Sequence, residues 1–393
     1  MAQGDKPYKV YKGGRTKGRV PVAGRPSQRD GGRPRRGRGS DDAPRGARTR
    51  RPRWGRRVGL TLLLVALLGV VWLVASYFAF RSGVQEANAR LPQSVQAALA
   101  PQNGLLVSKP TLILLLGTDG DRTQTARSDV ARSDSILLLR TDPRHNRMAF
   151  LSIPRDLRVE IPGYGSNKIN AAFQLGGPAL AMRTIRSLTG LQPNHVALVD
   201  FQDFRTVIDA LGGVTVDVPK PILSNRFDCP YATQARCQQW QGWRFEPGPQ
   251  EMSGKRALIY SRIRENRLDP AENDLTRGER QQAVVEAMAD ELVSPRTFVR
   301  LPFIGDDLVK PLATNLGAGE LLQLGWVRFR SNPSRTLHCR LGGELSSVGG
   351  SSVILGDEEN FAVIRMFEGK SAAQPPPPGQ PLAAGCVIGR GTR

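Results

Sequence analysis

Arginine and aspartate side chains flank a predicted strand pair in the segment RSDSILLLRTDPRHNRMAFLSIPRD, residues 132–156. Its apolar runs predict strands at 135–140 and 147–153, joined by a turn that contains Asp142 and Pro143. The outer ends of a hairpin lie side by side, and here they carry Arg132, Asp134, Arg155 and Asp156. Arginine suits phosphate because it donates paired hydrogen bonds and stays charged, and an aspartate among arginines suits a hard cation shared with the same phosphates. We therefore interpret this hairpin as half of a pyrophosphate site.

Two further segments carry arginine beside other polar residues: SRIR at 261–264 and DLTRGERQ at 274–281. Predicted strand ends and a helix start supply these segments, which is where an α/β sheet collects a ligand. Each residue alone also has a structural explanation. Asp274 could cap the helix, Thr276 and Glu279 match a capping box, and a lone arginine commonly forms a surface salt bridge. Taken together, the segments predict one anion-binding site.

The apolar periodicity predicts strands and helices that alternate around this site. The expected strands are 111–117, 195–200 and 214–218, and the expected helices are 178–188, 201–211 and 276–292. Pro178 suits the first turn of its helix and Gly190 its end, while 163–170 is expected to be a loop that carries Lys168. This order indicates an α/β domain with a mixed sheet between two helical layers, a three-layer α/β/α fold.

The helix at 276–292 changes character along its length. Arg277 and Gln281 lie one turn apart, and an apolar face continues at Val284, Val285, Met288 and Leu292. A face that begins polar and becomes apolar can run from a cavity wall into the core. We expect this helix and the 178–188 helix to wall a cavity for a lipid chain, with ordinary core packing as the alternative.

An uncharged apolar run at 58–80, VGLTLLLVALLGVVWLVASYFAF, is 23 residues long and can span a bilayer. The arginines directly before it are Arg50, Arg51, Arg53, Arg56 and Arg57, and only Arg81 follows closely. The positive-inside rule then predicts a single pass through the cytoplasmic (inner) membrane, with the N-terminus in the cytoplasm and the domain extracytoplasmic or periplasmic. A cleaved signal peptide is the alternative, because the Ala-Asn-Ala sequence at 87–89 resembles a cleavage site.

The net charge of +21 is concentrated in residues 1–57, where 19 Lys and Arg against 4 Asp and Glu give +15 and leave +6 for the rest. This segment has little to bury, so we expect a disordered basic cytoplasmic tail that contacts membrane lipids. It lacks interleaved aromatic residues, and we do not expect nucleic acid as a partner. The further expected divisions are a transmembrane helix at 58–80, a linker at 81–104, a catalytic domain at 105–370 and a Pro-rich tail at 371–393.

Four cysteines, all beyond the apolar run, agree with an oxidising compartment. Cys229 and Cys237 flank a short turn-rich insertion, and Cys339 and Cys386 lie far apart. We predict the pairs 229–237 and 339–386, although four cysteines permit three pairings. Zinc is not expected, because the sequence has no C-x-x-C and its three histidines are isolated from the cysteines.

Six blocks of the sequence, in order, resemble the LytR–CpsA–Psr (LCP) family. The matching blocks are LLLGTD (114–119), RSDSILLLRTDP (132–143), LSIPRD (151–156), KINAAF (168–173), DALGGVTVDV (209–218) and YSRIR with DLTRGERQ (260–264 and 274–281). The resemblance covers residues 105–295, and the cysteine-bracketed insertion departs from the commonest members.

The resemblance implies a phosphotransferase that moves a glycopolymer from a polyprenyl-pyrophosphate carrier onto a cell-wall acceptor, a peptidoglycan sugar hydroxyl. Asp119 and Asp134 would hold Mg²⁺ or Mn²⁺, with Asp121 as a substitute for Asp119. The implied pyrophosphate ligands are Arg132, Arg155, Arg262, Arg264, Arg277 and Gln281, supported by Lys168, Asp274 and Arg280. Arg132 and Arg155 would be catalytic through charge stabilisation, and Asp274 would help to remove the acceptor proton.

Two other functions remain open on the residues alone. A hydrolase would cleave polyprenyl pyrophosphate with water in place of the acceptor, and a non-catalytic envelope regulator would bind the lipid carrier without turning it over. The sequence contains neither G-x-S-x-G nor G-x-x-x-x-G-K-[ST], so it predicts neither a serine nucleophile elbow nor a P-loop.

Overall fold

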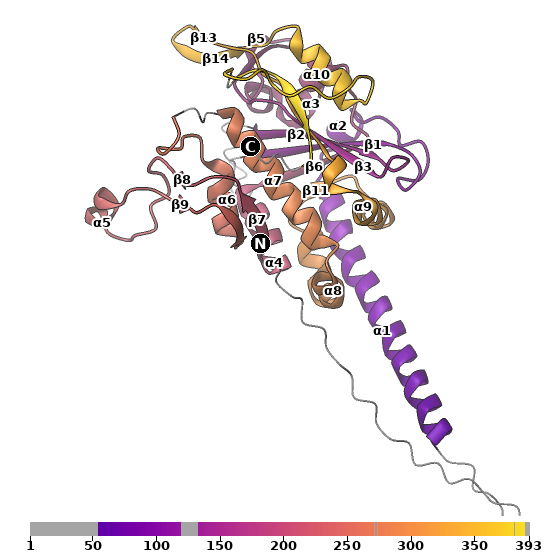
Figure 1. The fold of residues 1–393 in the computed structure, drawn as a ribbon. Coiled ribbons are helices and arrows are strands. Elements are labelled where there is room, and N and C mark those ends of the chain that lie inside the picture. The colour runs from indigo at the N-terminus through magenta and orange to yellow at the C-terminus, as the bar shows by residue number, and fades with distance from the viewer. Residues whose placement is uncertain (1–53, 119–132, 271, 273, 381, 390–393) are drawn as a thin grey trace, which may run out of the picture. The chain divides into compact units, whose positions relative to one another are not determined.

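The computed structural model describes residues 54–118, 133–270, 272, 274–380 and 382–389. The chain divides after Val58 into two units, and the described part of the first is only the start of helix α1 (Trp54–Ala89). The second unit, from Gly59 onward, contains the sheets and the other described helices (Figure 1). Within the described residues, α1 is the one helix long and apolar enough to cross a membrane.

A seven-stranded mixed sheet forms the centre of the second unit, in the order β11-β6-β1-β2-β3-β12-β15. Strand β1 pairs antiparallel with β2 and parallel with β6, and β3 continues the sheet antiparallel to β2 and parallel to β12. The strands are β1 (Thr111–Thr118), β2 (Ser133–Asp142), β3 (Arg147–Ser152), β6 (His195–Asp200), β11 (Ala313–Thr314), β12 (Leu337–Arg340) and β15 (Gly385–Ile388). The predicted mixed α/β fold is confirmed.

The hairpin strands are buried on both faces because their apolar residues alternate between two layers. Leu138 and Leu151 belong to the core under α3 (Ala171–Thr189) and α10 (Glu359–Phe367). Leu137 and Phe150 point to the other face, where Val285 of α7 (Asp274–Leu292) packs on them. Helices therefore cover both faces of the sheet, as the three-layer prediction requires (Figure 1).

A second core lies beside the sheet, around Phe245 and Tyr260, both almost fully buried. Most of its buried residues come from α1, α7, α4 (Phe201–Leu211), α6 (Gly254–Arg262) and α8 (Pro295–Val309), and α9 (Ala318–Arg330) packs against it. Small sheets complete the unit: β7 (Val214–Val218) with β10 (Gly248–Met252), β8 (Ile222–Leu223) with β9 (Arg244–Phe245), and β13 (Glu344–Val348), β14 (Ser351–Leu355), β4 (Leu157–Ile161) and β5 (Gly165–Lys168). The short helices are α2 (Gln93–Gln96), α5 (Gln234–Gln239) and the 3₁₀ turn η2 (Pro333–Arg335).

Most of the predicted elements are confirmed, and four segments differ. The expected linker at 81–104 packs into the fold, because Val84, Ala87, Leu91 and Val95 are buried in the two cores. The helix expected at 178–188 begins at 171, with a break at 176–177 before Pro178. The loop at 163–170 forms β5, which pairs with β4. The segment expected as a loose tail at 371–393 supplies β15, because 385–388 complete the sheet edge against β12.

Candidate functional site

The adjoining ends of β2 and β3 bring Asp134 and Arg155 together, as the sequence predicts. Nη1 of Arg155 donates a hydrogen bond to Oδ1 of Asp134 at 2.8 Å, and its Nε donates to Oδ2 of Asp156 at 3.3 Å. The three side chains are 14–21% exposed. An ion pair in this setting is partly desolvated, so its charges interact more strongly than a surface pair.

Lys168 joins this group from the end of β5. Its Nζ donates to Oδ1 of Asp156 at 2.8 Å. Burial works to raise the pKa of Asp156, but the hydrogen bond from Lys168 and the charge of Arg155 outweigh it and hold the pKa below its ordinary value. Asp156 is therefore an ionised carboxylate at neutral pH that orients Arg155 and Lys168.

The first turn of α7 supplies Arg277 and, one turn later, Gln281. Nη2 of Arg277 donates to the backbone carbonyl of Asp134 at 3.2 Å, and the residue is buried. Oε1 of Gln281 accepts from the hydroxyl of Ser135 at 2.9 Å, and its Nε2 donates to the carbonyl of Ser261 at 3.5 Å. The side chains that the sequence placed one turn apart thus both contact the start of β2.

Helix α7 approaches β3 closely because residue 278 is glycine. A Cβ at Gly278 would lie 2.5 Å from Oγ of Ser152, closer than any real contact. Between the helix and the hairpin lies a cleft of about 10 Å³, lined by Asp134, Arg155, Arg277 and Gln281 among others. That volume holds about one water molecule. We call Asp134, Arg155, Asp156, Lys168 and Arg277 the Asp134 cluster.

Arg340, at the end of β12, also lines this cleft and was missed by the sequence reasoning. Its Nη1 donates to Oε1 of Glu279 at 2.7 Å, and its Nε donates to the carbonyl of Ala383 at 3.1 Å. Arg340 lies outside the recognised motifs. The sequence offered one signal that could have found it. Arg340 directly follows Cys339, and the disulfide predicted for Cys339 would fix the end of this strand.

Arg262 lies at the end of α6 and contacts the cysteine-bracketed insertion. Its Nη1 forms an ion pair with Asp228, and its guanidinium stacks 4.7 Å from the ring centre of Phe201 and 5.6 Å from that of Phe227. Nε1 of Trp243 donates to the carbonyl of Phe227 at 2.9 Å, which holds that side of the stack. The structure therefore gives Arg262 a site of its own, beside the insertion.

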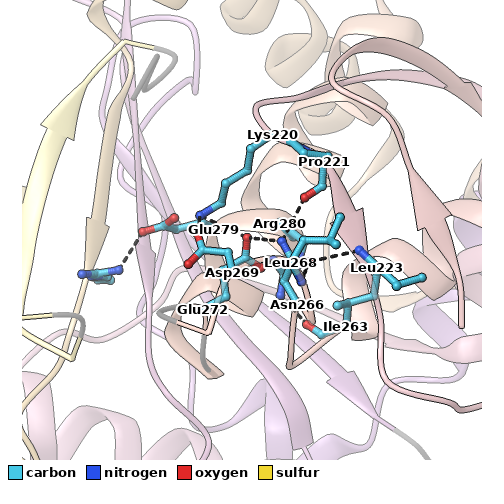
Figure 2. A network of polar contacts seen from close by, with 11 residues as sticks. Lys220, Pro221, Leu223, Ile263, Asn266, Leu268, Asp269, Glu272, Glu279 and Arg280 are labelled. Atoms are coloured by element: carbon cyan, nitrogen blue, oxygen red, sulfur yellow. Dashed lines mark hydrogen bonds and ion pairs between the residues drawn. The ribbon is translucent and has the colours of Figure 1, made fainter. Parts of the chain in front are cut away.

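Arg280 joins a separate network that ties α7 to the loop before it (Figure 2). Its Nη1 donates to Oε2 of Glu272 at 2.7 Å, and its Nη2 donates to the carbonyl of Ile263 at 2.5 Å. Lys220 bonds to Asp269 at 2.6 Å and to Glu272 at 3.1 Å. We call Lys220, Asn266, Asp269, Glu272 and Arg280 the Glu272 network.

Asn266 completes the Glu272 network. Its Nδ2 donates to Oε1 of Glu272 at 3.1 Å and to the carbonyl of Pro221 at 3.0 Å, while its Oδ1 accepts from the backbone of Leu223 (Figure 2). Arg264, the other arginine of the SRIR segment, is exposed to solvent. The structure thus assembles Arg155, Lys168, Arg277 and Gln281 in one place and sets Arg262, Arg264 and Arg280 outside that group.

A much larger cavity, of about 760 Å³, adjoins another face of α7. Its walls include Ala283 and Ala287 of α7, Val216 and Val218 of β7, and Tyr260. Burial raises the pKa of Tyr260 to about 12, so its hydroxyl is neutral at physiological pH. Arg340 lines both this cavity and the small cleft, so the two spaces are neighbours.

A cavity along α7 is therefore present as predicted, and the prediction that the 178–188 helix also walls it is wrong. Its occupation by a lipid chain stays a prediction. That part of α3 packs in the core on the other face of the sheet. The apolar face predicted to continue from Arg277 is ordinary core at Val284, Val285 and Met288, and Leu292 is 44% exposed. Different residues of α7 face the cavity, because the helix turns its other side towards it.

Three predicted site residues lie outside the described residues, and of a fourth only the backbone is described. Asp119, Asp121 and Arg132 belong to the segment 119–132, and Asp274 is described only as the first residue of α7. Their roles stay predictions. Both predicted disulfides are present, Cys229–Cys237 in the insertion and Cys339–Cys386 between β12 and β15.

The chain matches known proteins over most of its length. The model of the LytR_cpsA_psr family matches residues 75–365. The regulatory protein MsrR of Staphylococcus aureus (strain COL) is 33% identical over 259 residues, which cover 65% of this chain and 70% of MsrR. TagV of Bacillus subtilis (strain 168), a polyisoprenyl-teichoic acid–peptidoglycan teichoic acid transferase, is 28% identical over 309 residues, or 77% of this chain and 73% of TagV. The crystal structure of B. subtilis TagV superposes with a TM-score of 0.52 at 25% identity, covering 67% of this chain and 97% of that one.

Proposed function

This chain belongs to the LytR_cpsA_psr family, and we propose that it is a membrane-anchored transferase that moves a glycopolymer onto peptidoglycan. The relatives TagV and TagU are named as enzymes that transfer teichoic acid from a polyisoprenyl carrier to peptidoglycan. The donor proposed for this chain is a glycopolymer joined to a polyprenyl pyrophosphate, and the acceptor is a peptidoglycan sugar hydroxyl.

The observation that carries this proposal is the convergence of Asp134, Arg155 and Arg277. They come from the start of β2, the turn that follows β3 and the first turn of α7. Hydrogen bonds of 2.8 and 3.2 Å join Asp134 to Arg155 and to Arg277. Phosphoryl transfer needs mainly positioning and neutralisation of charge, and fixed guanidinium groups supply both. Arginine here would stabilise the charge that develops on the departing phosphate.

The proposed step forms one bond and breaks one. The acceptor hydroxyl oxygen attacks the phosphorus attached to the glycopolymer, and the anhydride bond to the second phosphorus breaks. Polyprenyl phosphate leaves and keeps the bridging oxygen of the anhydride. The hydroxyl proton passes to a carboxylate, for which Asp274 is our candidate. Arg155, Arg277, Lys168 and Gln281 would hold the pyrophosphate, with Arg132 predicted to join them.

We also propose that Mg²⁺ or Mn²⁺ binds at Asp134. Within the described residues, no three His, Cys, Asp or Glu side chains gather as a metal site. One or two carboxylates plus substrate phosphates are what Mg²⁺ usually takes, so Asp134 fits such a site, with Asp119 as the predicted second carboxylate. A bound ion would supply further neutralisation of phosphate charge, beside that of Arg155.

The cavity of about 760 Å³ is our proposed place for the first part of the polyprenyl chain. It adjoins the small cleft at Arg340, so a lipid whose pyrophosphate lies on the Asp134 cluster could enter it directly. Aliphatic side chains from α7 and β7 would contact the hydrocarbon, and Lys220, Glu272 and Arg280 of the Glu272 network also line the cavity.

For the topology, α1 is the proposed anchor, with the N-terminus in the cytoplasm and the domain outside the cytoplasmic membrane. The arginines before the apolar run support this orientation. The two disulfides agree with an oxidising compartment for the domain.

The deciding experiment supplies the full-length chain, in detergent micelles, with a polyprenyl-pyrophosphate-linked oligosaccharide and peptidoglycan fragments. Mass spectrometry then searches for a phosphodiester between them. We expect that product from the parent chain and from Arg183→Ala, an exposed arginine on α3, but not from Arg155→Ala. Retained transfer by Arg155→Ala would remove Arg155 from the site.

The same assay separates the two alternative functions. Oligosaccharide phosphate released into water without an acceptor would indicate a hydrolase. Binding of the donor with no product at all would indicate a regulator, the role in the name of the relative MsrR.

A further inference from the structure

Helix α8 exposes large apolar side chains although it belongs to a folded domain. It begins at Ser294, whose Oγ accepts from the backbone of Thr297 at 3.2 Å, and Pro295 forms its first turn. Ile304, Leu308 and Val309 of α8 are buried in the second core. On the other side Phe298, Val299 and Phe303 are 58, 65 and 83% exposed. Such a cluster on one helix marks an interaction surface.

This exposed side lies next to α1. Nε1 of Trp72 donates to the carbonyl of Val299 at 3.1 Å, and the rings of Trp72 and Phe298 lie 4.5 Å apart. Further along, a Cβ at Gly305 would lie 3.2 Å from the backbone nitrogen of Phe80.

The contact between the two helices continues past the apolar run. Nζ of Lys310 lies 3.4 Å from Oε2 of Glu86, and Nη1 of Arg90 donates to the carbonyl of Lys310 at 2.5 Å. Residue numbers rise together along both helices, so α8 follows α1 in the same direction, with its first turns beside Trp72.

The depth of this contact follows from helix geometry. A hydrocarbon core about 30 Å thick needs about 20 helical residues, so a span that starts after Arg57 extends to about residue 78. Trp72 lies about 12 Å before Phe80 along the axis, at about 1.5 Å per residue. The first turns of α8 touch Trp72 and therefore lie at the level of the hydrocarbon.

The basic residues of these turns are compatible with this position. Arg300 donates to the carbonyls of Leu211 and Ala210 at the end of α4, at 2.9 and 3.2 Å. The guanidinium of Arg296 lies beside Gly212 at the same helix end. Arg300 is thus bound to the domain, and the exposed Arg296 reaches the same helix end with its guanidinium.

We propose that the first half of α8 is a second membrane contact, in which Phe298, Val299 and Phe303 insert among the acyl chains of the extracytoplasmic leaflet beside α1. This inference rests on the membrane anchoring proposed above and goes beyond it. A single spanning helix can tilt in the bilayer, and the domain into which α1 packs would tilt with it. Contact at α8 holds it against the bilayer in one orientation, with α8 facing the lipids.

The test places the photoreactive residue p-benzoylphenylalanine at single positions of the full-length chain, in vesicles of phosphatidylethanolamine and phosphatidylglycerol. Position 303 reports on α8. Position 64, 57% exposed within the apolar run, is the positive control. Position 361, a 66% exposed phenylalanine on α10, is the matched negative control, because α10 packs on the other face of the sheet. These side chains are exposed, so their replacement removes little core packing.

After irradiation, mass spectrometry should find phospholipid adducts at positions 303 and 64, and none above the unirradiated level at 361. Adducts at 64 but not at 303 would overturn the inference. A protein dimer crosslinked through 303 would also overturn it and assign the surface to a second copy. If position 64 gave no lipid adduct, both the proposed anchor and the proposed α8 contact would be wrong. Transfer activity measured on the same vesicles tests the proposed enzyme separately.

Discussion

Helix α7 carries two arginines three residues apart, and they belong to two different regions. Arg277 contacts the start of β2 in the Asp134 cluster, beside a cleft of about 10 Å³. Arg280 is bound to Glu272 in a buried network beside a cavity of about 760 Å³. Both arginines are buried, but the first region joins Arg277 to partly exposed charges at the ends of β2 and β3. The second region surrounds Arg280 with a carboxylate and a backbone carbonyl.

The comparison shows that one motif can serve both a reaction and the fold. DLTRGERQ gives both arginines the same sequence context, yet only the direction of each side chain decides its partners. Arg277 lines the cleft, and Arg280 fixes the loop that leads into α7.

The largest effect is expected from breaking the Glu272 network. Glu272→Ala leaves Arg280 buried without its carboxylate, and such a change typically costs about 3–5 kcal/mol of unfolding free energy. Urea unfolding in detergent micelles measures it. The double variant Glu272→Met with Arg280→Met should recover most of this loss, because no lone charge remains. If Arg280→Met abolished transfer without loss of stability, Arg280 would belong to the site after all.

Removal of Arg277 should act on transfer more than on stability. Arg277→Ala takes away a fixed donor at the cleft, and loss of one such donor typically lowers kcat by about 10²–10³-fold. Steady-state transfer measures this, with Arg183→Ala as the surface control. Arg277→Lys should recover only part of the activity, because lysine lacks the paired donors. Full activity of Arg277→Ala would contradict our division between the two regions.

The two regions should also limit stability at opposite ends of the pH range. The lowered pKa of Asp156 means that its stabilising contribution is present above the ordinary carboxyl pKa and is lost as pH falls through the lower folded value. Burial works to lower the pKa of Lys220, but hydrogen bonds to Asp269 and Glu272 raise it overall. Its contribution is therefore lost as pH rises through that raised value.

Thermal unfolding midpoints across the pH range measure both contributions. Lys168→Met should reduce stability near neutral pH and flatten the loss on the acid side, because it removes a bond that lowers the pKa of Asp156. Lys220→Met should flatten the loss on the alkaline side. The same pH profile for both variants would show that the two regions are electrostatically coupled.

The smallest effect is expected at Arg262, which belongs neither to the Asp134 cluster nor to the Glu272 network. Its partner Asp228 is half exposed, so the pair contributes about 0.2–1 kcal/mol at most. Asp228→Asn should free the guanidinium for a phosphate and lower the KM for the donor by less than about fivefold, with kcat unchanged. A higher KM would show instead that Asp228 holds Arg262 in place for the substrate.

The sequence predicts the centre of this molecule well because its signals there are local. Strand alternation, the hairpin turn and the spacing of Arg277 and Gln281 decide which residues meet at the sheet edge. The contacts of Arg262 and Arg280 could not be predicted, because their partners Asp228 and Glu272 come from irregular segments without periodicity. Arg340 was missed for a different reason: the strand that brings it to the cleft comes from a distant part of the chain.

Strand β15 has a consequence for the timing of assembly. It is synthesised 47 residues after its disulfide partner in β12, and its residues Gly385 and Val387 line the large cavity. Until that strand has been made, the sheet stops at β12 and the large cavity lacks part of its wall. The bridge that secures the strand forms only in an oxidising compartment. The wall of the large cavity is therefore completed only after β15 has been made, and it is secured only where disulfides can form.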